Sequence, residues 1–289
     1  MKVGNRTKLF AIIGMPAHHS LSPAIHNAAF EKEGINAVFL AFDVPKDKLM
    51  EAIEGMKAFG ISGLTLTSPH KEEAHRYVDN VDKFAEEIEA VNTIVNKNGK
   101  LMGYNSDSPG FLKTVRKVNA KTGPYAVVGA GGAARAFVFA ILNYNPRARI
   151  HIINRTMNNA KKLQNNASRY YPNAVMDSCM LGSREMERSV KESRFVINAT
   201  NITLENSTRT PIPRSMLNRK MTVFDANYVP FESRLLKEAR LAGCDTINGL
   251  ELLVNQGVVA FKLFTGKSTD YNIMKKAALN ELEKIKERR

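Results

Sequence analysis

Cysteine is scarce in this sequence: Cys179 and Cys244 are the only two among 289 residues. Two isolated cysteines exclude a disulfide framework and the paired spacings of zinc sites, and they indicate a reducing cytoplasm. The six histidines also lack the spacing of metal ligands, and the adjacent His18 and His19 are expected to point in different directions. We therefore expect no bound metal.

Long apolar runs are missing as well. No run approaches the roughly 18 apolar residues of a transmembrane helix, and the segment 9–13 is too short for the core of a signal peptide. Hydrophobic residues make up 44% and charged residues 24% of the chain, which is typical of a soluble globular protein. These features predict a cytoplasmic protein with no membrane partner and enough length for two domains.

Acidic residues are few, 28 against 42 Lys and Arg, which leaves a net charge of +14. Such an excess is one sign of nucleic-acid binding, because basic patches contact phosphate backbones. The basic residues are scattered, however, with no arginine-rich tract and no recognisable nucleic-acid module. We interpret the charge as a solvated basic surface that attracts anionic small molecules, and we expect no nucleic-acid partner.

Segments of strand and helix character alternate along the chain. Strands are predicted at 8–13, 37–43, 63–66, 93–96, 101–104, 125–128, 149–154, 174–177, 195–198, 223–225 and 246–247. Helices are predicted at 23–33, 46–59, 71–78, 133–142, 158–168 and 273–289. This β-α-β rhythm is typical of an α/β fold with parallel sheets covered by helices.

No linker rich in Pro, Gly or Ser separates domains, but Pro109-Gly110 interrupts the pattern. The helical segments after Gly249 come too late for a six-stranded nucleotide-binding domain and are expected to return to the first domain. We therefore predict a three-layer substrate domain from 1–108 and 250–289, and a Rossmann-type nucleotide-binding domain from 109–249. The cleft between two such domains would be the default site.

A glycine-rich turn, Gly129-Ala130-Gly131-Gly132-Ala133, joins a predicted strand to a predicted helix. That context is typical of a dinucleotide-binding fingerprint. Gly129 would permit the tight turn, Gly131 would let the backbone approach a pyrophosphate, and the small Ala134 would let helix and strand pack closely. The N–H groups at the start of the helix would then hold the phosphates.

The next strand ends in Asn154-Arg155-Thr156. A protein that selects NAD usually carries Asp or Glu at this place, to bind the ribose hydroxyl. A carboxylate would repel a 2′-phosphate, whereas Arg155 can form a charge-assisted bidentate pair with it. The sequence therefore favours NADP.

Polar side chains also follow the strands of the first half. Ser20 and Ser22 can donate to a substrate carboxylate, although Ser22 is equally explained as the N-cap of the next helix. Thr67 and Lys71 follow the third strand, where ligands bind in α/β domains. Partial burial would let Lys71 exchange protons near neutral pH, while the alternative is a solvated lysine at a helix start.

Two further strands of the first half have polar neighbours. Asn92 lies beside one of them, and Asn105-Ser106-Asp107 follows the other. Asp107 is either a loop acid that caps the following turn or a functional acid. In the second case it would pair with Lys71 and hold a substrate hydroxyl. His70 is considered only as a wall of the site.

Together, these motifs resemble those of the shikimate dehydrogenase family, along nearly the whole chain and in the family's order. The resemblance implies reduction of 3-dehydroshikimate to shikimate with NADPH, with Lys71 and Asp107 as the catalytic pair. The substrate contacts that it implies are Ser20, Ser22, Thr67, Lys71, Asn92, Asp107, Tyr228 and Gln256. The NADP contacts that it implies are Gly129, Ala130, Gly131, Gly132, Ala133, Asn154, Arg155, Thr156, Thr200, Ala226 and Gly249.

The sequence departs from the family's pattern at several places. Thr65, Ser68 and Ser106 stand where the family usually has Asn, an aliphatic residue and Thr. Thr65 keeps a hydroxyl but has a shorter reach toward the substrate. After Thr200 the family usually continues with small residues, glycine and methionine, whereas this chain has Asn201-Ile202-Thr203-Leu204. We expect this loop to contact the cofactor differently.

In the implied mechanism, Lys71 and Asp107 flank the oxygen at C3 of the substrate, stabilise its charge and relay its proton. Either residue can be the formal donor, because a close pair titrates as a unit. An alternative is that the substrate is quinate or an amino analogue of shikimate, with NAD or NADP as the cofactor. A second alternative is a nucleotide-sensing binding protein without activity. The expected partner is a small molecule, and the expected state is a monomer or homodimer.

Overall fold

The computed structural model describes residues 3–116, 123–202 and 208–287. The chain divides into a first unit, Met1–Gly110 with Leu253–Arg289, and a second unit, Phe111–Leu252. Both boundaries fall inside helices, namely α4 (Asp107–Arg116) and α10 (Gly249–Thr265). The expectation that Pro109-Gly110 interrupts the pattern is therefore wrong. Pro109 lies in the first turn of α4, where a proline removes no helical hydrogen bond.

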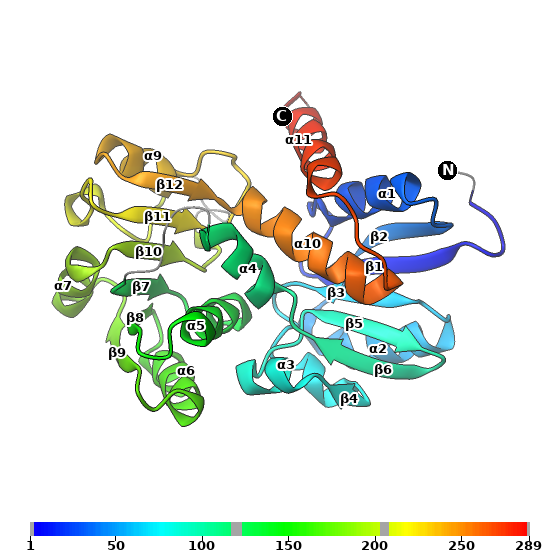
Figure 1. The fold of residues 1–289 in the computed structure, drawn as a ribbon, viewed down its shortest axis with the longest axis horizontal. Helices are drawn as coiled ribbons and strands as arrows, with labels where there is room; N and C mark the ends of the chain where they lie inside the picture. Colours follow the sequence, from blue (N-terminus) through cyan, green and yellow to red (C-terminus); the bar gives the residue numbers. More distant parts are fainter. Residues whose placement is uncertain (1–2, 117–122, 203–207, 288–289) are drawn as a thin grey trace. The chain divides into compact units, whose positions relative to one another are not determined.

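The first unit contains a six-stranded sheet in the order β2-β1-β3-β5-β6-β4 (Figure 1). Its strands are β1 (Lys8–Gly14), β2 (Ala37–Asp43), β3 (Gly63–Leu66), β4 (Asn80–Val81), β5 (Thr93–Lys97) and β6 (Lys100–Tyr104). The sheet is mixed, because β5 runs antiparallel to both β3 and β6. The expectation of parallel sheets is thus wrong for this unit. Only Asn98 and Gly99, both with positive φ, connect β5 to β6, which leaves no room for a crossover helix.

Helices cover both faces of this sheet, which gives the unit three layers. On one face, α1 (Ser22–Lys32), α10 and α11 (Tyr271–Glu287) surround an aromatic cluster that includes Phe10 and Phe30. On the other, α2 (Leu49–Ala58) and α3 (Lys83–Ile88) cover an apolar cluster. Neighbouring β1 residues supply the two clusters, since alternate side chains of a strand point to opposite faces.

The helix predicted at 71–78 is largely absent. A turn at 71–73 leads only to a short 3₁₀ helix, η2 (Ala74–Tyr77). In an α-helix the Lys71 carbonyl would accept from residue 75, but here it accepts from Val91 N–H at 2.8 Å. The segment predicted at 46–59 also opens with a 3₁₀ turn, η1 (Lys46–Lys48), before α2.

The second unit is built on a fully parallel sheet in the order β12-β11-β10-β7-β8-β9. The strands are β7 (Tyr125–Val128), β8 (Arg149–Asn154), β9 (Val175–Met180), β10 (Phe195–Asn198), β11 (Thr222–Asp225) and β12 (Asp245–Asn248). Chain order therefore reverses between β7 and β10. This is the doubly wound Rossmann order, in which ligands bind outside the carboxyl ends of the strands next to that reversal.

Helices again cover both faces of the second sheet. On one face, α5 (Gly132–Tyr144) and α4 contribute Phe137 and Phe111, whose rings stack at 4.4 Å, and α6 (Met157–Tyr170) lies over β8 and β9. On the other, α7 (Arg184–Glu192) and α9 (Arg234–Leu241) bury an apolar cluster. The predicted α/β fold is thus confirmed: each unit has a sheet that is covered by helices.

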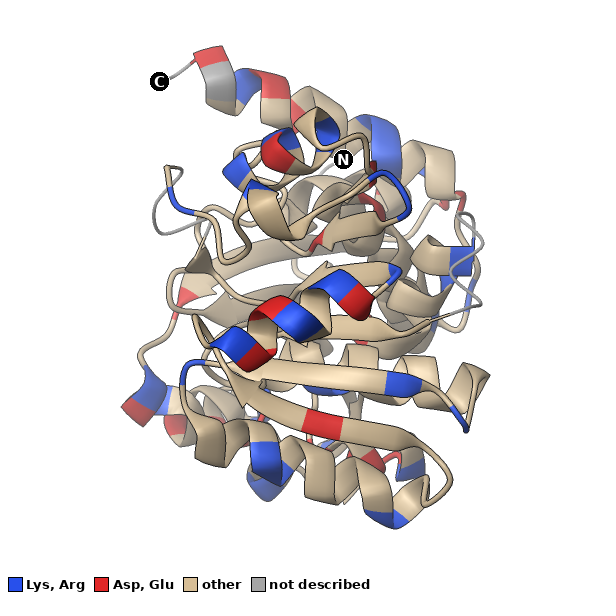
Figure 2. Ribbon diagram, turned by 90° about the vertical axis from the view of Figure 1, so that its left-hand side faces the viewer, with Lys and Arg blue, Asp and Glu red and all other residues tan. Residues whose placement is uncertain are grey.

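Charged residues are distributed over many elements of the structure. Figure 2 shows Lys and Arg interspersed with Asp and Glu on helices of the second unit. Some form pairs along one helix, such as Lys191 with Glu187 at 2.6 Å. In the described ranges, no helix combines the length and the apolar character that a membrane span requires.

Candidate functional site

Polar residues from four strands meet at one edge of the sheet in the first unit. The carboxyl ends of β1, β3 and β6 share this edge, and the antiparallel β5 brings its amino end there. The residues that the sequence singled out follow or precede these ends: Ser20, Ser22, Thr67, Lys71, Asn92 and Asp107. A parallel β5 would have carried Asn92 to the opposite edge, so the reversed strand is what completes the set.

Lys71 and Asp107 form an ion pair at this edge. Lys71 Nζ lies 2.6 Å from Asp107 Oδ2, and the side chains are 17% and 8% exposed. Asp107 is the first residue of α4, where a carboxylate interacts favourably with the helix dipole. A shielded ammonium and carboxylate in contact can exchange a proton with a bound hydroxyl group, because each lies close to its partner and away from bulk water.

Asn92 is held in place by its own carbonyl oxygen. Its Oδ1 accepts from Ser106 N–H at 2.7 Å and lies 3.1 Å from the hydroxyl groups of both Ser106 and Thr93. These contacts occupy the oxygen, so the amide NH₂ is the group that Asn92 can offer to a ligand. Ser106, which the sequence did not assign a role, also lies 3.2 Å from Gln256 Oε1. It therefore ties Gln256 of α10 to Asn92.

The two serines lie side by side at the start of α1. Ser20 Oγ accepts from Ser22 N–H and donates to Ser22 Oγ, each at 3.1 Å. Helix α1 begins at Ser22, with Leu21 as its N-cap residue and no side-chain cap. The interpretation of Ser22 as the N-cap is therefore wrong. Two hydroxyl groups at a helix amino end suit an anion such as a carboxylate.

Thr65 lies in β3, and Thr67 directly follows that strand. Thr67 is half-buried, and its methyl group lies so close to Gly14 that a Cβ there would approach within 2.1 Å. Thr65 is buried, and its Oγ1 has no hydrogen-bond partner among the described residues. His70 is buried too, with Nε2 2.8 Å from Val44 O.

The glycine turn of the second unit needs glycine at Gly129 for two reasons. Its φ is +119°, and a Cβ would lie 3.1 Å from Ala199 O. Gly131 is the N-cap residue of α5, which begins at Gly132 and carries no acid in its first turn. Ala134, two residues further on, is fully buried. The turn and helix start thus offer backbone N–H groups to a phosphate without a competing carboxylate.

The end of β8 carries no acidic residue either. Asn154 Nδ2 donates to Thr156 O at 2.9 Å, which closes the turn into α6, and Arg155 and Thr156 are exposed. No ion pair occupies Arg155 or Lys161 within the part of the chain that the structure describes. These donors fit a 2′-phosphate, and the site therefore fits NADP.

A buried carboxylate organises the neighbouring loops. Asp225 Oδ1 accepts from Asn198 Nδ2 at 3.0 Å and from both nitrogens of Asn227, while Oδ2 accepts from Ser233. Asn198 Oδ1 in turn accepts a hydrogen bond from the Thr200 hydroxyl group at 2.6 Å. This network, which sequence reasoning missed, fixes the segments that carry Thr200, Ala226 and the half-buried Tyr228. Asp225 ends a strand, which was the available signal.

Gly249 packs against the same region of the second unit. A Cβ at Gly249 would lie 2.2 Å from Ala226 O, so only glycine permits this approach. Of the loop after Thr200 that was expected to be altered, Thr203 and Leu204 lie outside the described residues.

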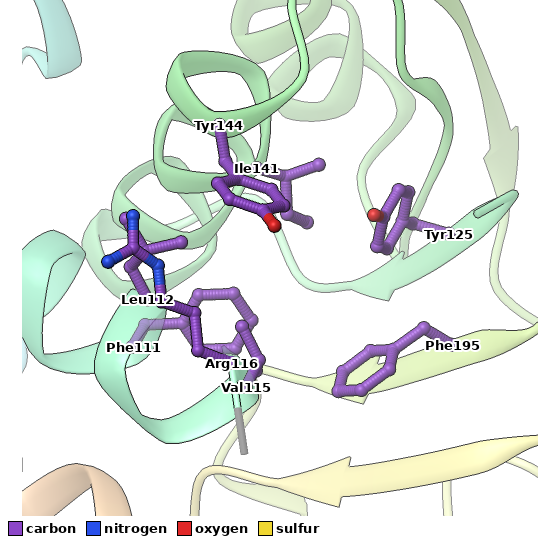
Figure 3. A pocket seen from close by; sticks show the side chains of 8 residues that line it. All are labelled: Phe111, Leu112, Val115, Arg116, Tyr125, Ile141, Tyr144 and Phe195. Carbon is purple, nitrogen blue, oxygen red and sulfur yellow. The ribbon is translucent and has the colours of Figure 1, made fainter. Parts of the chain in front are cut away.

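The second unit also contains an apolar pocket elsewhere (Figure 3). Tyr125 and Phe195 line it at the amino ends of β7 and β10, opposite to the Gly129 turn, together with Ile141. Arg116 lies over the ring of Tyr144 at 5.4 Å. None of the expected site residues lines this pocket. Within residues 3–116, 123–202 and 208–287, no three His, Cys, Asp or Glu side chains are grouped as metal ligands.

Comparisons with known proteins agree with these features. Residues 12–94 match the shikimate dehydrogenase substrate binding domain, and residues 249–279 match the shikimate 5′-dehydrogenase C-terminal domain. A shikimate dehydrogenase (NADP(+)) of Thermococcus kodakarensis is 40% identical over 94% of this chain and 96% of its own length.

Solved structures are similar as well. A shikimate 5-dehydrogenase of Thermus thermophilus in complex with NADP(H) and shikimate has a TM-score of 0.85 at 33% identity, over 95% of this chain and 99% of that one. A quinate dehydrogenase of Corynebacterium glutamicum in complex with NAD has a TM-score of 0.85 at 28% identity, with the same coverage of both chains. The identity and coverage of the first relative show that this chain belongs to the shikimate dehydrogenase family.

Proposed function

We propose that this protein catalyses the reversible NADP-dependent interconversion of shikimate and 3-dehydroshikimate. A relative is named shikimate dehydrogenase (NADP(+)), and a similar structure holds NADP(H) and shikimate. The observation that carries the proposal is the shielded Lys71–Asp107 pair, which lies at the same sheet edge as Asn92 and the two serines. The reaction belongs to the pathway to chorismate and the aromatic amino acids. We expect a cytoplasmic monomer or homodimer.

The paired charges account for the proton chemistry. Oxidation of a secondary alcohol removes a proton from the hydroxyl group and a hydride from the carbon, and bound NADP⁺ supplies the hydride acceptor. Lys71 and Asp107 take up the proton as the alcohol is oxidised. In the reverse direction they stabilise the charge that develops on the carbonyl oxygen and return the proton.

The remaining polar groups orient the substrate. Ser20 and Ser22 hold the substrate carboxylate at the start of α1, and the Asn92 amide donates to a ring hydroxyl group. Thr67 and Gln256 complete the contacts from the first unit, and Tyr228 is the contact from the second. Fixing the carboxylate and the hydroxyl groups places C3 at the catalytic pair, which lowers the entropic part of the barrier.

NADP would be held by the second unit. The Gly129-Ala130-Gly131-Gly132-Ala133 turn binds the pyrophosphate, and Asn154, Arg155 and Thr156 bind the adenosine ribose with its 2′-phosphate. Thr200, Ala226 and Gly249 line the nicotinamide side. Support comes from the backbone at Gly129, the acid-free start of α5 and the uncommitted guanidinium of Arg155.

Quinate oxidation with NAD is the second candidate, since a related structure carries that name. Arg155 at the end of β8 and the presence of two serines at the carboxylate position favour shikimate and NADP. Initial rates at the absorbance band of reduced nicotinamide, for shikimate or quinate with NADP⁺ or NAD⁺, test both. We expect the highest kcat/KM for shikimate with NADP⁺. A higher kcat/KM for quinate with NAD⁺, or no reduction in any pairing, would refute the proposal.

A further inference from the structure

A carboxylate outside the catalytic motifs holds the loop that carries the two serines. Asp43 is the last residue of β2, the edge strand beside β1. Its Oδ1 accepts from the backbone N–H groups of Ala17 at 2.5 Å and His18 at 2.9 Å. Its Oδ2 lies 2.5 Å from Nδ1 of His18. One side chain thus closes three contacts on two consecutive residues of the loop between β1 and α1.

These contacts continue to the serines. Ala17 O accepts from Ser20 N–H at 2.9 Å, and Ser20 Oγ accepts from Ser22 N–H at 3.1 Å. The His19 ring lies against the His18 ring, with centroids 3.7 Å apart and the planes tilted by 55°, so the expectation that the two rings point in different directions is wrong. Hydrogen bonds and the backbone between them therefore connect the Asp43 carboxylate to the segment that carries both hydroxyl groups.

Val44, the residue after Asp43, makes hydrogen bonds to β1 and to the segment that precedes Lys71. Val44 N–H donates to Gly14 O at 2.8 Å, and Val44 O accepts from Nε2 of His70 at 2.8 Å. His70 directly precedes Lys71. The end of β2 therefore contacts two segments. The Asp43 side chain contacts the loop between β1 and α1, and the Val44 carbonyl contacts His70, next to Lys71.

We infer that Asp43 is a positioning residue that sets the spacing of Ser20 and Ser22 for the substrate carboxylate. The inference rests on the proposed function, because it takes the serines as the groups that bind this carboxylate. The side-chain contacts of Asp43 are with Ala17 and His18 and not with Lys71 or Asp107, so it acts on substrate affinity rather than on the chemical step.

The charge state of Asp43 suits this role. The hydrogen bond from Ala17 N–H, with those from His18, lowers the pKa of Asp43 below its usual value. The group therefore stays ionised, and keeps accepting, throughout the pH range of an assay. The groups that face it are the His18 ring and the two backbone amides, and the paired side chains are 34% (Asp43) and 54% (His18) exposed.

The test compares three variants in steady-state kinetics. Asp43→Ala removes every contact and should raise KM for shikimate about tenfold, because two backbone donors lose a charged acceptor. Its kcat and its KM for NADP⁺ should change less than about twofold, since uniform binding is what is lost. Asp43→Asn keeps an acceptor at Oδ1 and should restore most of the affinity. His18→Ala removes only the Oδ2 contact and should have the smallest effect.

Asp47→Ala is the matched control, since Asp47 is an exposed carboxylate shortly after β2 on the 3₁₀ turn η1. It should keep the wild-type KM. A merely structural role of Asp43 would lower the melting temperature and the active fraction, and hence the apparent kcat, without moving KM for shikimate. That outcome would overturn the inference.

Amide hydrogen exchange supplies a readout that does not depend on activity. In Asp43→Ala, exchange in a peptide covering 17–22 should rise about tenfold or more, because the Ala17 and His18 amides lose their acceptor. A peptide covering 67–71 should keep its exchange rate, because Thr67 N–H still donates to Ile13 O and His70 N–H to Thr67 O, each at 3.0 Å. If the wild-type protein oxidises shikimate but Asp43→Ala keeps its KM and its exchange rates, the inference alone is wrong. If the wild-type protein does not oxidise shikimate, the proposed function is wrong, and the exchange rates at 17–22 still decide whether Asp43 holds the loop.

Discussion

The two units use the same part of an α/β sheet in different ways. At the sheet edge of the first unit, the groups offered to a ligand are side chains: two hydroxyls, an amide, an ammonium and a carboxylate. At the corresponding ends of β7 and β8 in the second unit, they are mainly backbone N–H groups exposed by glycine, with one arginine beside them. A small polar ring needs several directional contacts, whereas a pyrophosphate is satisfied by a helix start.

The two edges also differ in how they are stabilised. In the second unit a single buried carboxylate, Asp225, holds the neighbouring loops. In the first unit, hydrogen bonds pass from one functional residue to the next, as from Gln256 through Ser106 to Asn92. We therefore expect substitutions at the sheet edge of the first unit to change turnover or substrate affinity, and substitutions at the ends of β7 and β8 to change cofactor affinity.

The largest effect should follow from Lys71→Ala. Loss of the ammonium removes half of the proton-transfer pair and should lower kcat about 10³-fold, with NADP⁺ affinity unchanged. Steady-state rates and a fluorescence titration of NADPH measure the two quantities. Lys57, an exposed partner of Asp79 at 3.2 Å in the same unit, gives the matched variant Lys57→Ala, which should retain wild-type kcat. Wild-type turnover in Lys71→Ala would contradict the view that side chains at the sheet edge of the first unit carry out the chemistry.

Arg155→Ala should have the next largest effect, confined to the cofactor. A charge-assisted contact with a 2′-phosphate is worth roughly 1.5–3 kcal/mol, so kcat/KM for NADP⁺ should fall about 10- to 100-fold. The value for NAD⁺, which lacks that phosphate, should stay the same. Lys162→Ala, at an exposed position of α6, is the comparison variant. An equal loss with both cofactors would show that Arg155 acts on the fold and not on the phosphate.

Gly129→Ala sharpens the contrast between backbone and side-chain binding. Alanine at φ +119° beside Ala199 O should lower the unfolding free energy by about 1–2 kcal/mol and weaken NADP⁺ binding about tenfold. Gly182 has φ +85° with no atom within 4 Å of an added Cβ. Gly182→Ala should therefore show similar strain in a denaturation curve and bind NADP⁺ normally. Unchanged NADP⁺ binding in Gly129→Ala would argue against the backbone cradle.

The smallest effect on activity is expected for His26 of α1, which acts on stability instead. Complete burial lowers the pKa of His26 to about 3, and its ring stacks on Phe39 at 4.4 Å. In the unfolded chain His26 has a pKa near 6.5, so between that pH and pH 3 it binds a proton that it does not bind in the folded chain. Stability is therefore fully present above pH 6.5 and falls toward pH 3, by up to about 1.4 kcal/mol per pH unit.

Urea denaturation between pH 7 and 4 measures this slope. His26→Phe should flatten it, whereas His75→Gln, at an exposed position, should leave it unchanged. An identical slope in His26→Phe would assign the acid sensitivity to other groups. In either case the second unit, which does not contain His26, should show no change in NADP⁺ affinity.

Strand positions could largely be predicted from the sequence. The bounds expected at 37–43, 63–66, 125–128, 149–154 and 195–198 coincide with β2, β3, β7, β8 and β10, because each is an apolar run between polar or turn residues. Strand direction could not be read from those runs. The reversal at β5 depends on the two-residue turn Asn98-Gly99, a hairpin signal that the β-α-β rhythm concealed.

The candidate site was predictable residue by residue but not as a network. Lys71 and Asp107 belong to sequence motifs, and their contact depends on which edge each strand end reaches. Asp43 was not singled out and Ser106 was assigned no role, because their roles lie in contacts made across the fold, with Ala17 in one case and Asn92 in the other. The available signal for both was their place at or just after the end of a strand, which is also the place of Asp107.

The central claim is that the Lys71–Asp107 pair performs the proton chemistry. Asp107→Asn tests it most directly, because the substitution keeps the size of the side chain and removes its charge. Stopped-flow measurement of NADP⁺ reduction, at saturating shikimate and NADP⁺ established by prior titration, reports the chemical step. The account predicts near-normal binding of both ligands and a rate lowered about 10²-fold or more. A rate equal to that of the wild-type protein would contradict it.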